Sequence, residues 1–133
     1  MAKVTTFLMF QGKKAEEAMT FYVSLFPDSA IGRIERYGPQ GPGAEGSVMT
    51  ASFTLAGREY LAIDSPVPHA FGFTPAISLF VDFEAAEELD AAYAKLAEGG
   101  GVLMPLGDYG FSRRFAWVND RFGVSWQLNL PFA

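Results

Sequence analysis

Hydrophobic and polar residues alternate in the stretch GVSWQLNLP at residues 123–131. Trp126 and Leu128 take hydrophobic positions, and Gln127 and Asn129 take polar positions beside them. A period of two residues predicts a β-strand that turns one face toward a core and the other toward a polar environment. The pattern therefore raises the question of what the side chain of Gln127 faces.

The same alternation, together with turn residues, predicts strands and helices along the whole chain. The expected strands cover residues 5–10, 30–37, 47–55, 58–64, 76–81, 102–106, 113–118 and 124–130. The expected helices cover residues 13–25 and 84–98. Pro27 ends the first helix, and the glycines of EGGG at residues 98–101 end the second. Asp82 is the expected cap of the second helix.

The two halves of the chain share one pattern. AEEAMTFYVSL at residues 15–25 aligns with AEELDAAYAKL at residues 86–96 when the chain is shifted by 71 residues against itself. The same shift places TTFLMF at residues 5–10 on AISLFV at residues 76–81. Each half then consists of a strand, a helix and three strands, so the chain is predicted to contain a βαβββ module twice.

We therefore expect an α+β fold with two βαβββ modules, mixed curled sheets and helices outside. We expect a single domain, residues 1–133. Neither module can bury its hydrophobic face alone, so the modules should pair, either within one chain or by exchange between two chains of a dimer. Module 1 is expected at about residues 1–64 and module 2 at about residues 76–131. The linker, about residues 65–75, contains three prolines, which indicate a rigid connection.

Composition and charge exclude several classes of protein. Half of the residues are hydrophobic and no cysteine is present, which excludes a disordered chain, disulfides and thiolate metal sites. The net charge is −5 and no basic cluster exceeds a pair, so nucleic acid is not an expected partner. No hydrophobic run has the length of about 20 residues that a membrane helix needs. Without a recognisable signal peptide, the expected location is the cytoplasm.

Three segments resemble the vicinal oxygen chelate superfamily, which includes glyoxalase I, extradiol dioxygenases and bleomycin-resistance proteins. They are TTFLMFQGKKAEEAMTFYVSLFPDS (5–29), FGFTPAISLFVD (71–82) and NDRFGVSWQLNLP (119–131). Within this superfamily the chain is most similar to the PhnB-like branch, the 3-demethylubiquinone-9 3-methyltransferase-like family. The resemblance implies that each half curls its sheet into a cup with the helix outside, that ligands bind within the cups, and that the chain forms a homodimer.

In the metal-dependent relatives, four side chains bind one divalent ion. They come from the first and fourth strands of each half, typically a His or Gln on the first strand and a Glu on the fourth. These four positions fall on Thr5, Leu61, Ala76 and Gln127. Leucine and alanine offer no lone pair, and the set contains no carboxylate. We therefore expect neither a glyoxalase-type metal site nor any other cofactor.

Strand alternation predicts which side chains enter the cups. If Gln127 faces a cup, the other inward positions are mainly apolar with a few polar groups, as in small-molecule sites. The candidate ligand-binding residues are Phe7, Met9, Leu61, Ser78, Phe80, Ser125 and Gln127. The expected function is the binding of a small organic molecule, with Gln127 fixing its orientation. In the alternative interpretation, Gln127 only ties two strands together inside a filled cavity.

An enzyme built on the same pocket remains the alternative function. Glu59 or His69 would then handle a proton in an isomerase, lyase or hydrolysis step. A divergent metal enzyme, such as a dioxygenase-like one, would combine His69, Glu59 and Gln127. Methyl transfer is not expected, because EGGG follows a helix and a nucleotide-type donor needs a glycine-rich turn between strand and helix. The glycine- and proline-rich loop 38–46 is either a lid or an ordinary mobile loop.

Overall fold

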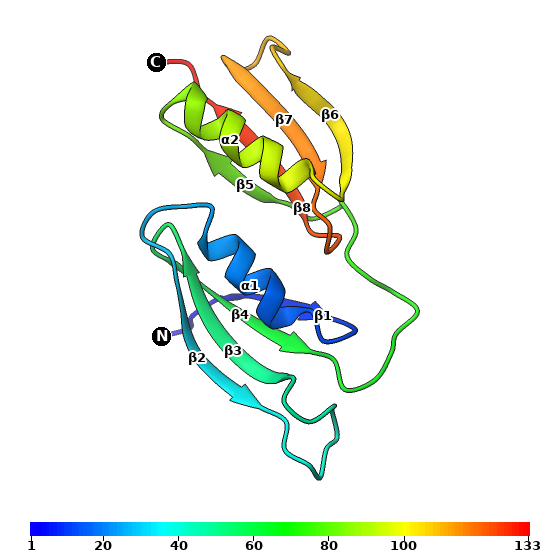
Figure 1. Cartoon of the computed structure of the whole chain (residues 1–133). Helices are drawn as coiled ribbons and strands as arrows, with labels where there is room; N and C mark the ends of the chain where they lie inside the picture. The colour runs from blue at the N-terminus through cyan, green and yellow to red at the C-terminus, as the bar shows by residue number, and fades with distance from the viewer. The chain divides into compact units, whose positions relative to one another are not determined.

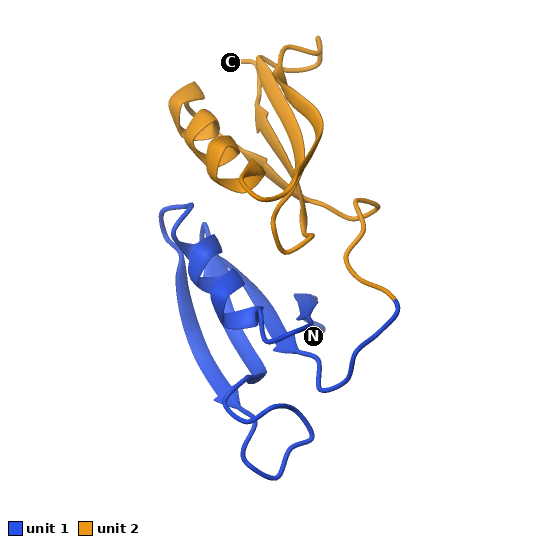
Figure 2. Cartoon of the chain, turned by 45° about the vertical axis from the view of Figure 1, so that its right-hand side comes forward, with its two compact units in different colours: residues 1–70 blue, residues 71–133 orange.

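The computed structural model describes all 133 residues, which form two compact units. Unit 1 spans Met1–Ala70 and unit 2 spans Phe71–Ala133 (Figure 2). Each unit contains one βαβββ module, as the internal repeat predicts. None of the helices is long and apolar enough to span a membrane.

Unit 1 contains a four-stranded sheet with one helix (Figure 1). Its elements are β1 (Thr6–Phe10), α1 (Ala15–Val23), β2 (Ala30–Arg36), β3 (Val48–Leu55) and β4 (Arg58–Asp64). The strand order is β1-β4-β3-β2, with β1 parallel to β4 and the other neighbours antiparallel. The parallel pair needs the long crossover that α1, β2 and β3 provide, whereas β3 and β4 are joined by a short turn.

Unit 2 repeats this arrangement in the second half of the chain. Its elements are β5 (Leu79–Asp82), α2 (Ala86–Ala97), β6 (Gly101–Gly107), β7 (Arg114–Asn119) and β8 (Ser125–Leu130). The strand order is β5-β8-β7-β6, with β5 parallel to β8. The prediction of two βαβββ modules in an α+β fold is confirmed.

The core of each unit lies between the helix and one face of the sheet. In unit 1 the fully buried Met19 and Tyr22 of α1 lie on this side, and the ring of Tyr22 lies 6.4 Å from that of Phe53 on β3. In unit 2 the fully buried Leu89 of α2 and Leu128 of β8 belong to the corresponding layer. The opposite face of each sheet has no helix of its own unit on it, because the module has only one helix.

Several predicted boundaries differ from the structure. Both helices are shorter than expected, and the strand predicted at residues 76–81 begins only at Leu79, which leaves Ala76 in a turn. Asp82 does not cap α2: it belongs to β5, and the residue at the N-cap of α2 is Ala85, which makes no side-chain hydrogen bond. The carboxylate of Asp82 instead accepts a hydrogen bond from Asn129 Nδ2 at 2.8 Å.

The internal repeat is also less regular than a single shift of 71 residues. Phe7 pairs with Leu61, and Phe80 pairs with Gln127. Gly57 and Gly123 lie in the turns before β4 and β8, and aligning these glycines matches Leu61 with Gln127. Their strand neighbours Phe7 and Phe80 then match at a shift of 73 residues. The first residues of the two helices, Ala15 and Ala86, still match at a shift of 71 residues. The two shifts differ because the connection from the first strand to the helix is longer in unit 1 than in unit 2.

Candidate functional site

The open face of the second sheet carries a row of three side chains. Phe80 on β5, Gln127 on β8 and Trp117 on β7 are cross-strand neighbours, with Gln127 in the middle. The residues on either side of Gln127 in the chain, Trp126 and Leu128, are buried on the face that α2 covers. Alternation therefore places Gln127 on the open face, as predicted from the strand pattern.

The side chain of Gln127 is half-buried and makes no hydrogen bond within the chain. The strands are tied together instead by Ser125, whose Oγ lies 2.8 Å from Ser78 Oγ. Ser125 Oγ also accepts a hydrogen bond of 2.8 Å from Trp117 Nε1. These bonds occupy the predicted site residues Ser78 and Ser125 with each other, whereas the amide of Gln127 keeps its donors and its acceptor available.

Four aromatic side chains form a cluster at one end of this open face. Phe115 on β7 is 4% exposed and contacts the rings of Phe80, Tyr109 and Phe111 at centroid distances of 6.4, 6.2 and 4.9 Å. Phe80 and Phe111 are 56% and 57% exposed. We call Phe80, Tyr109, Phe111 and Phe115 the aromatic cluster. Sequence reasoning found Phe80 but missed the other three, because Tyr109 and Phe111 lie in a loop with no strand periodicity.

Asn129, the next residue of β8 on the open face, is 9% exposed. Its Nδ2 donates to Asp82, but its Oδ1 is buried without a hydrogen-bond partner. The carboxylate of Asp82 can only accept, which fixes the orientation of the Asn129 amide. A buried oxygen without a partner costs about 1–3 kcal/mol, so this end of the open face has unsatisfied polar capacity.

The open face of the first sheet is more apolar. Alternation places Phe7 and Met9 of β1 and Leu61 of β4 on it, because their neighbours Leu8, Phe10 and Ala62 are buried. Glu59 lies on the same face at the start of β4 and forms an ion pair of 2.5 Å with Lys3 Nζ. The pair is exposed, so Glu59 has the surroundings of a solvated surface carboxylate.

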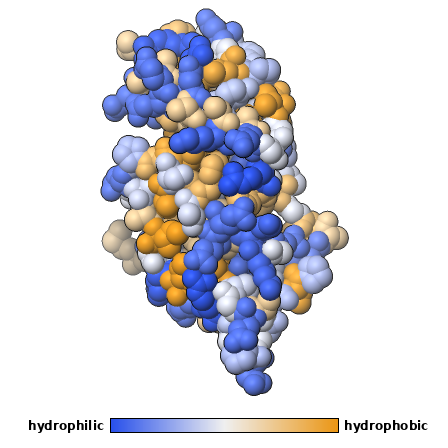
Figure 3. All heavy atoms as spheres, viewed as in Figure 1, coloured by the Kyte–Doolittle hydropathy of each residue, from blue (hydrophilic) through white to orange (hydrophobic).

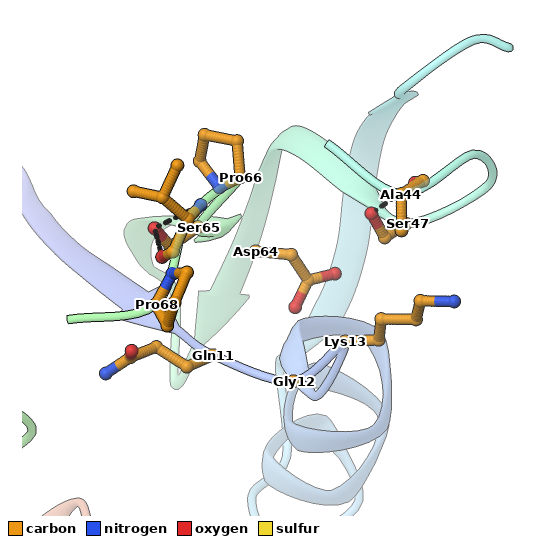
Figure 4. A pocket seen from close by; sticks show the side chains of 10 residues that line it. Gln11, Gly12, Lys13, Ala44, Ser47, Asp64, Ser65, Pro66 and Pro68 are labelled. Carbon is orange, nitrogen blue, oxygen red and sulfur yellow. Dashed lines mark hydrogen bonds between the residues drawn. The ribbon is translucent and has the colours of Figure 1, made fainter. Parts of the chain in front are cut away.

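A pocket of about 260 Å³ lies in unit 1 where β1 and β4 end and α1 begins (Figure 4). Figure 4 shows the side chain of Asp64 between Ser65 on one side and Ser47 on the other. Asp64 is 3% exposed, and its carboxylate accepts hydrogen bonds from the backbone N–H groups of Ala15 and Val48 at 2.9 and 2.8 Å. The sequence did not predict this pocket, because its wall combines three segments that are distant along the chain.

His69 lies beside this pocket rather than on an open sheet face. Its Nε2 is 2.9 Å from Ser65 Oγ, and its backbone N–H donates to Gln11 Oε1 at 2.7 Å. Ser65 Oγ also donates to the carbonyl of Val67 at 2.7 Å. Since a hydroxyl has one proton, His69 Nε2 is then the donor in the Ser65–His69 bond. The structure thus gives Glu59 and His69 different surroundings and does not join them in one constellation.

Loop 38–46 connects β2 to β3 and is held at its base. The backbone N–H of Tyr37 donates to Ser47 O, and that of Gly46 donates to Tyr37 O, both at 2.9 Å. Its tip, at the bottom of Figure 3, is hydrophilic. Ala44 of the loop lines the pocket, so the loop forms one of its borders.

The residues at the superfamily's metal positions do not fit that metal site. The Leu61 side chain offers no lone pair, Ala76 lies in a turn outside β5, and the strand neighbours of Leu61 and Gln127 are the phenylalanines Phe7 and Phe80. No group of three or more His, Cys, Asp or Glu side chains is placed to hold a metal ion. A divergent metal enzyme would combine His69, Glu59 and Gln127. Two of these residues, Glu59 and His69, belong to unit 1, and they do not form a metal-binding group there.

Comparison with known proteins identifies the family. The family model described as 3-demethylubiquinone-9 3-methyltransferase matches residues 2–129. The putative 3-demethylubiquinone-9 3-methyltransferase, PhnB protein, from Bacillus cereus is 59% identical, with a TM-score of 0.94 over 97% of this chain and 99% of that chain. No curated protein matches.

Two more distant structures share the fold. A protein from Pseudomonas aeruginosa is 24% identical, with a TM-score of 0.81 over 98% of both chains. The fosfomycin resistance protein FosX from Listeria monocytogenes is 10% identical, with a TM-score of 0.63 over 99% of this chain and 94% of that chain. By the family model and the Bacillus cereus relative, the chain belongs to the 3-demethylubiquinone-9 3-methyltransferase-like (PhnB) family.

Proposed function

We propose that this chain binds a small organic molecule on the open face of its second sheet, without a glyoxalase-type metal. The observation that carries the proposal is the side chain of Gln127, which is half-buried and without a hydrogen-bond partner. The amide atoms of Gln127 are not among the buried polar atoms that lack a partner, so they are accessible at the surface, and an available amide beside aromatic side chains is suited to a ligand. Gln127 would orient the ligand, and Phe80 and Trp117 would exclude water beside it.

The family's printed name suggests methyl transfer, which the local backbone does not favour. A nucleotide-type methyl donor is typically held by a glycine-rich turn that leads from a strand into a helix. The connection from β1 to α1 contains a single glycine, Gly12, and the connection from β5 to α2 contains none. Our proposal is therefore one of ligand binding and includes no methyl transfer.

A dye titration with a matched pair of variants tests this proposal. The probe is 1-anilinonaphthalene, an uncharged aromatic dye that fluoresces in apolar surroundings. Phe80 and Phe132 have similar exposed fractions, 56% and 61%, but Phe132 lies near the C-terminus outside the strands. Phe80→Ala should weaken dye binding at least about fivefold, as expected for the loss of one aromatic contact. Phe132→Ala should leave it unchanged.

The contrary result is equal dye affinity in the wild-type chain and both variants. It would show that the dye finds apolar surface elsewhere and that Phe80 is not part of a binding site. Circular dichroism of each variant checks that the fold is retained. Mass spectrometry of the native chain, purified without chelators, then reports any small molecule or metal ion that accompanies it.

A further inference from the structure

We infer that the ligand of this site is a planar heteroaromatic ring that carries an N–H donor next to a carbonyl acceptor on one edge. This inference rests on the proposed function and narrows it to a chemical class. The donor–acceptor edge would meet the amide of Gln127, and the face of the ring would stack on the aromatic cluster. Lactam-type heterocycles have this edge.

The first step of the argument concerns the chemistry of the Gln127 side chain. A carboxamide presents a carbonyl acceptor and an NH₂ donor side by side in one plane. The same pairing lets glutamine and asparagine recognise a donor–acceptor edge of adenine with two parallel hydrogen bonds. In this chain no residue makes a hydrogen bond to the Gln127 amide, and the side-chain bonds to Ser78 and Trp117 are made by Ser125. Both hydrogen bonds are therefore available to one ligand edge.

The second step concerns the surface beside that amide. Phe80 is the cross-strand neighbour of Gln127, and its ring is both 56% exposed and in contact with Phe115. Phe111, which is 57% exposed, contacts the same buried Phe115 ring. Exposed aromatic rings that pack against a buried ring stack well on flat molecules and poorly on branched aliphatic ones. Phe80 lies next to Gln127, and Phe115, the cross-strand neighbour of Asn129, connects it to Phe111, so the arrangement favours a flat ligand that extends from Gln127 over Phe80.

The third step concerns charge. The row that contains Gln127 consists of uncharged side chains, Phe80 on one side and Trp117 on the other. The next residue of β5 on this face, Asp82, carries a carboxylate that accepts a hydrogen bond from Asn129 and would repel an anionic ligand. A neutral polar edge matches this row better than a carboxylate or phosphate does, because a buried anion needs a charged partner.

A pair of probes that differ in one atom's hydrogen-bonding capacity tests the inference. 2-Quinolone carries the N–H and C=O edge, and N-methyl-2-quinolone has the same rings with the donor blocked. We expect 2-quinolone to bind at least about tenfold more tightly, as a bidentate amide contact requires. In Gln127→Leu the two probes should bind alike, and in the control Gln40→Leu, at an exposed loop position, the difference should persist.

Nuclear magnetic resonance of the side-chain amides provides a direct readout. The chain contains three glutamines, Gln11, Gln40 and Gln127, so the NH₂ signals are few and the variants assign them. 2-Quinolone should shift the Gln127 signals and leave those of Gln40 in place. Equal affinity of the two probes for the wild-type chain would overturn the inference while leaving the proposed function intact. Failure of both quinolones and of the anilinonaphthalene dye to bind would overturn both.

Discussion

Asp64, at the end of β4, accepts a hydrogen bond of 2.9 Å from the backbone N–H of Ala15, the first residue of α1 and 49 residues earlier in the chain. Its second carboxylate oxygen accepts from the N–H of Val48, the first residue of β3. One buried carboxylate therefore accepts hydrogen bonds from the first backbone N–H group of α1 and the first of β3. The same side chain forms part of the pocket wall.

Replacing this carboxylate should lower the stability of the first unit. Asp64→Asn retains the size of the side chain but turns one acceptor oxygen into an NH₂ donor that faces a backbone donor. We expect the free energy of unfolding to fall by about 1–3 kcal/mol, the cost of an unsatisfied buried group. Urea titration followed by circular dichroism measures it. Glu45→Gln, in the exposed loop, is the control, and an equally stable Asp64→Asn chain would contradict the role assigned to Asp64.

Glu16 and Arg36 make a two-bond ion pair that should give the stability a specific pH dependence. Arg36 Nη1 and Nη2 donate to the Glu16 carboxylate at 2.8 and 2.9 Å. These hydrogen bonds and the positive charge of Arg36 hold the pKa of Glu16 below its ordinary value of 4.5, although burial opposes the shift. A lowered folded-state pKa means that the stabilisation is present above pH 4.5 and is lost as the pH falls below it.

The variant Glu16→Gln tests this pH dependence. It should unfold at a lower temperature than the wild-type chain at pH 7, and the difference should vanish as the pH falls below 4.5. The effect should be small, because both side chains are partly exposed to solvent. A difference in melting temperature that stays constant from pH 7 to pH 3 would rule out the ion pair as its source.

Gly100 and Gly101 are adjacent but should respond differently to alanine. A Cβ atom at Gly100 would clash with the carbonyl oxygen of Asn119, which belongs to the backbone and cannot rotate away. A Cβ atom at Gly101 would meet nothing within 4 Å. Gly100→Ala should therefore cost about 1–3 kcal/mol of stability, and Gly101→Ala should stay within about 0.5 kcal/mol of the wild-type chain. Equal melting temperatures of the two variants would contradict this contact.

Removal of metal ions should leave ligand binding unchanged. The row of Phe80, Gln127 and Trp117 contains no carboxylate or imidazole, so binding on the second sheet should be independent of divalent ions. We expect the same dye affinity and melting temperature before and after dialysis against a chelator. Restoration of lost binding by zinc, manganese or nickel would show that a metal takes part.

Strand alternation predicts much of this architecture, and the reason is geometric. Side chains of a strand point to opposite faces in turn, so the open-face position of Gln127 follows from the buried positions of Trp126 and Leu128. The repeat of strand, helix and three strands follows from the same periodicities in both halves. Both features depend on residues that are close together in the chain.

The parts that sequence reasoning missed depend on distant residues. Nothing in the local sequence around Asp64 shows that its carboxylate accepts hydrogen bonds from Ala15 and Val48. Asp82 has the residue type and position of a helix cap, yet β5 continues through it because β8 lies alongside as a partner. The aromatic cluster was missed for a similar reason, since Tyr109 and Phe111 reach Phe115 from a loop.

Leu61 and Gln127 occupy equivalent positions in two copies of one module, and this equivalence separates the fold from the choice of ligand. The backbone around each position is the same, because the hydrogen bonds of the sheet do not depend on the side chain that stands on its open face. One copy can therefore exchange an alkyl group for an amide while the other stays as it is. A duplicated scaffold of this kind can acquire new ligand preferences through single substitutions on its open faces, with no insertion and no change of topology.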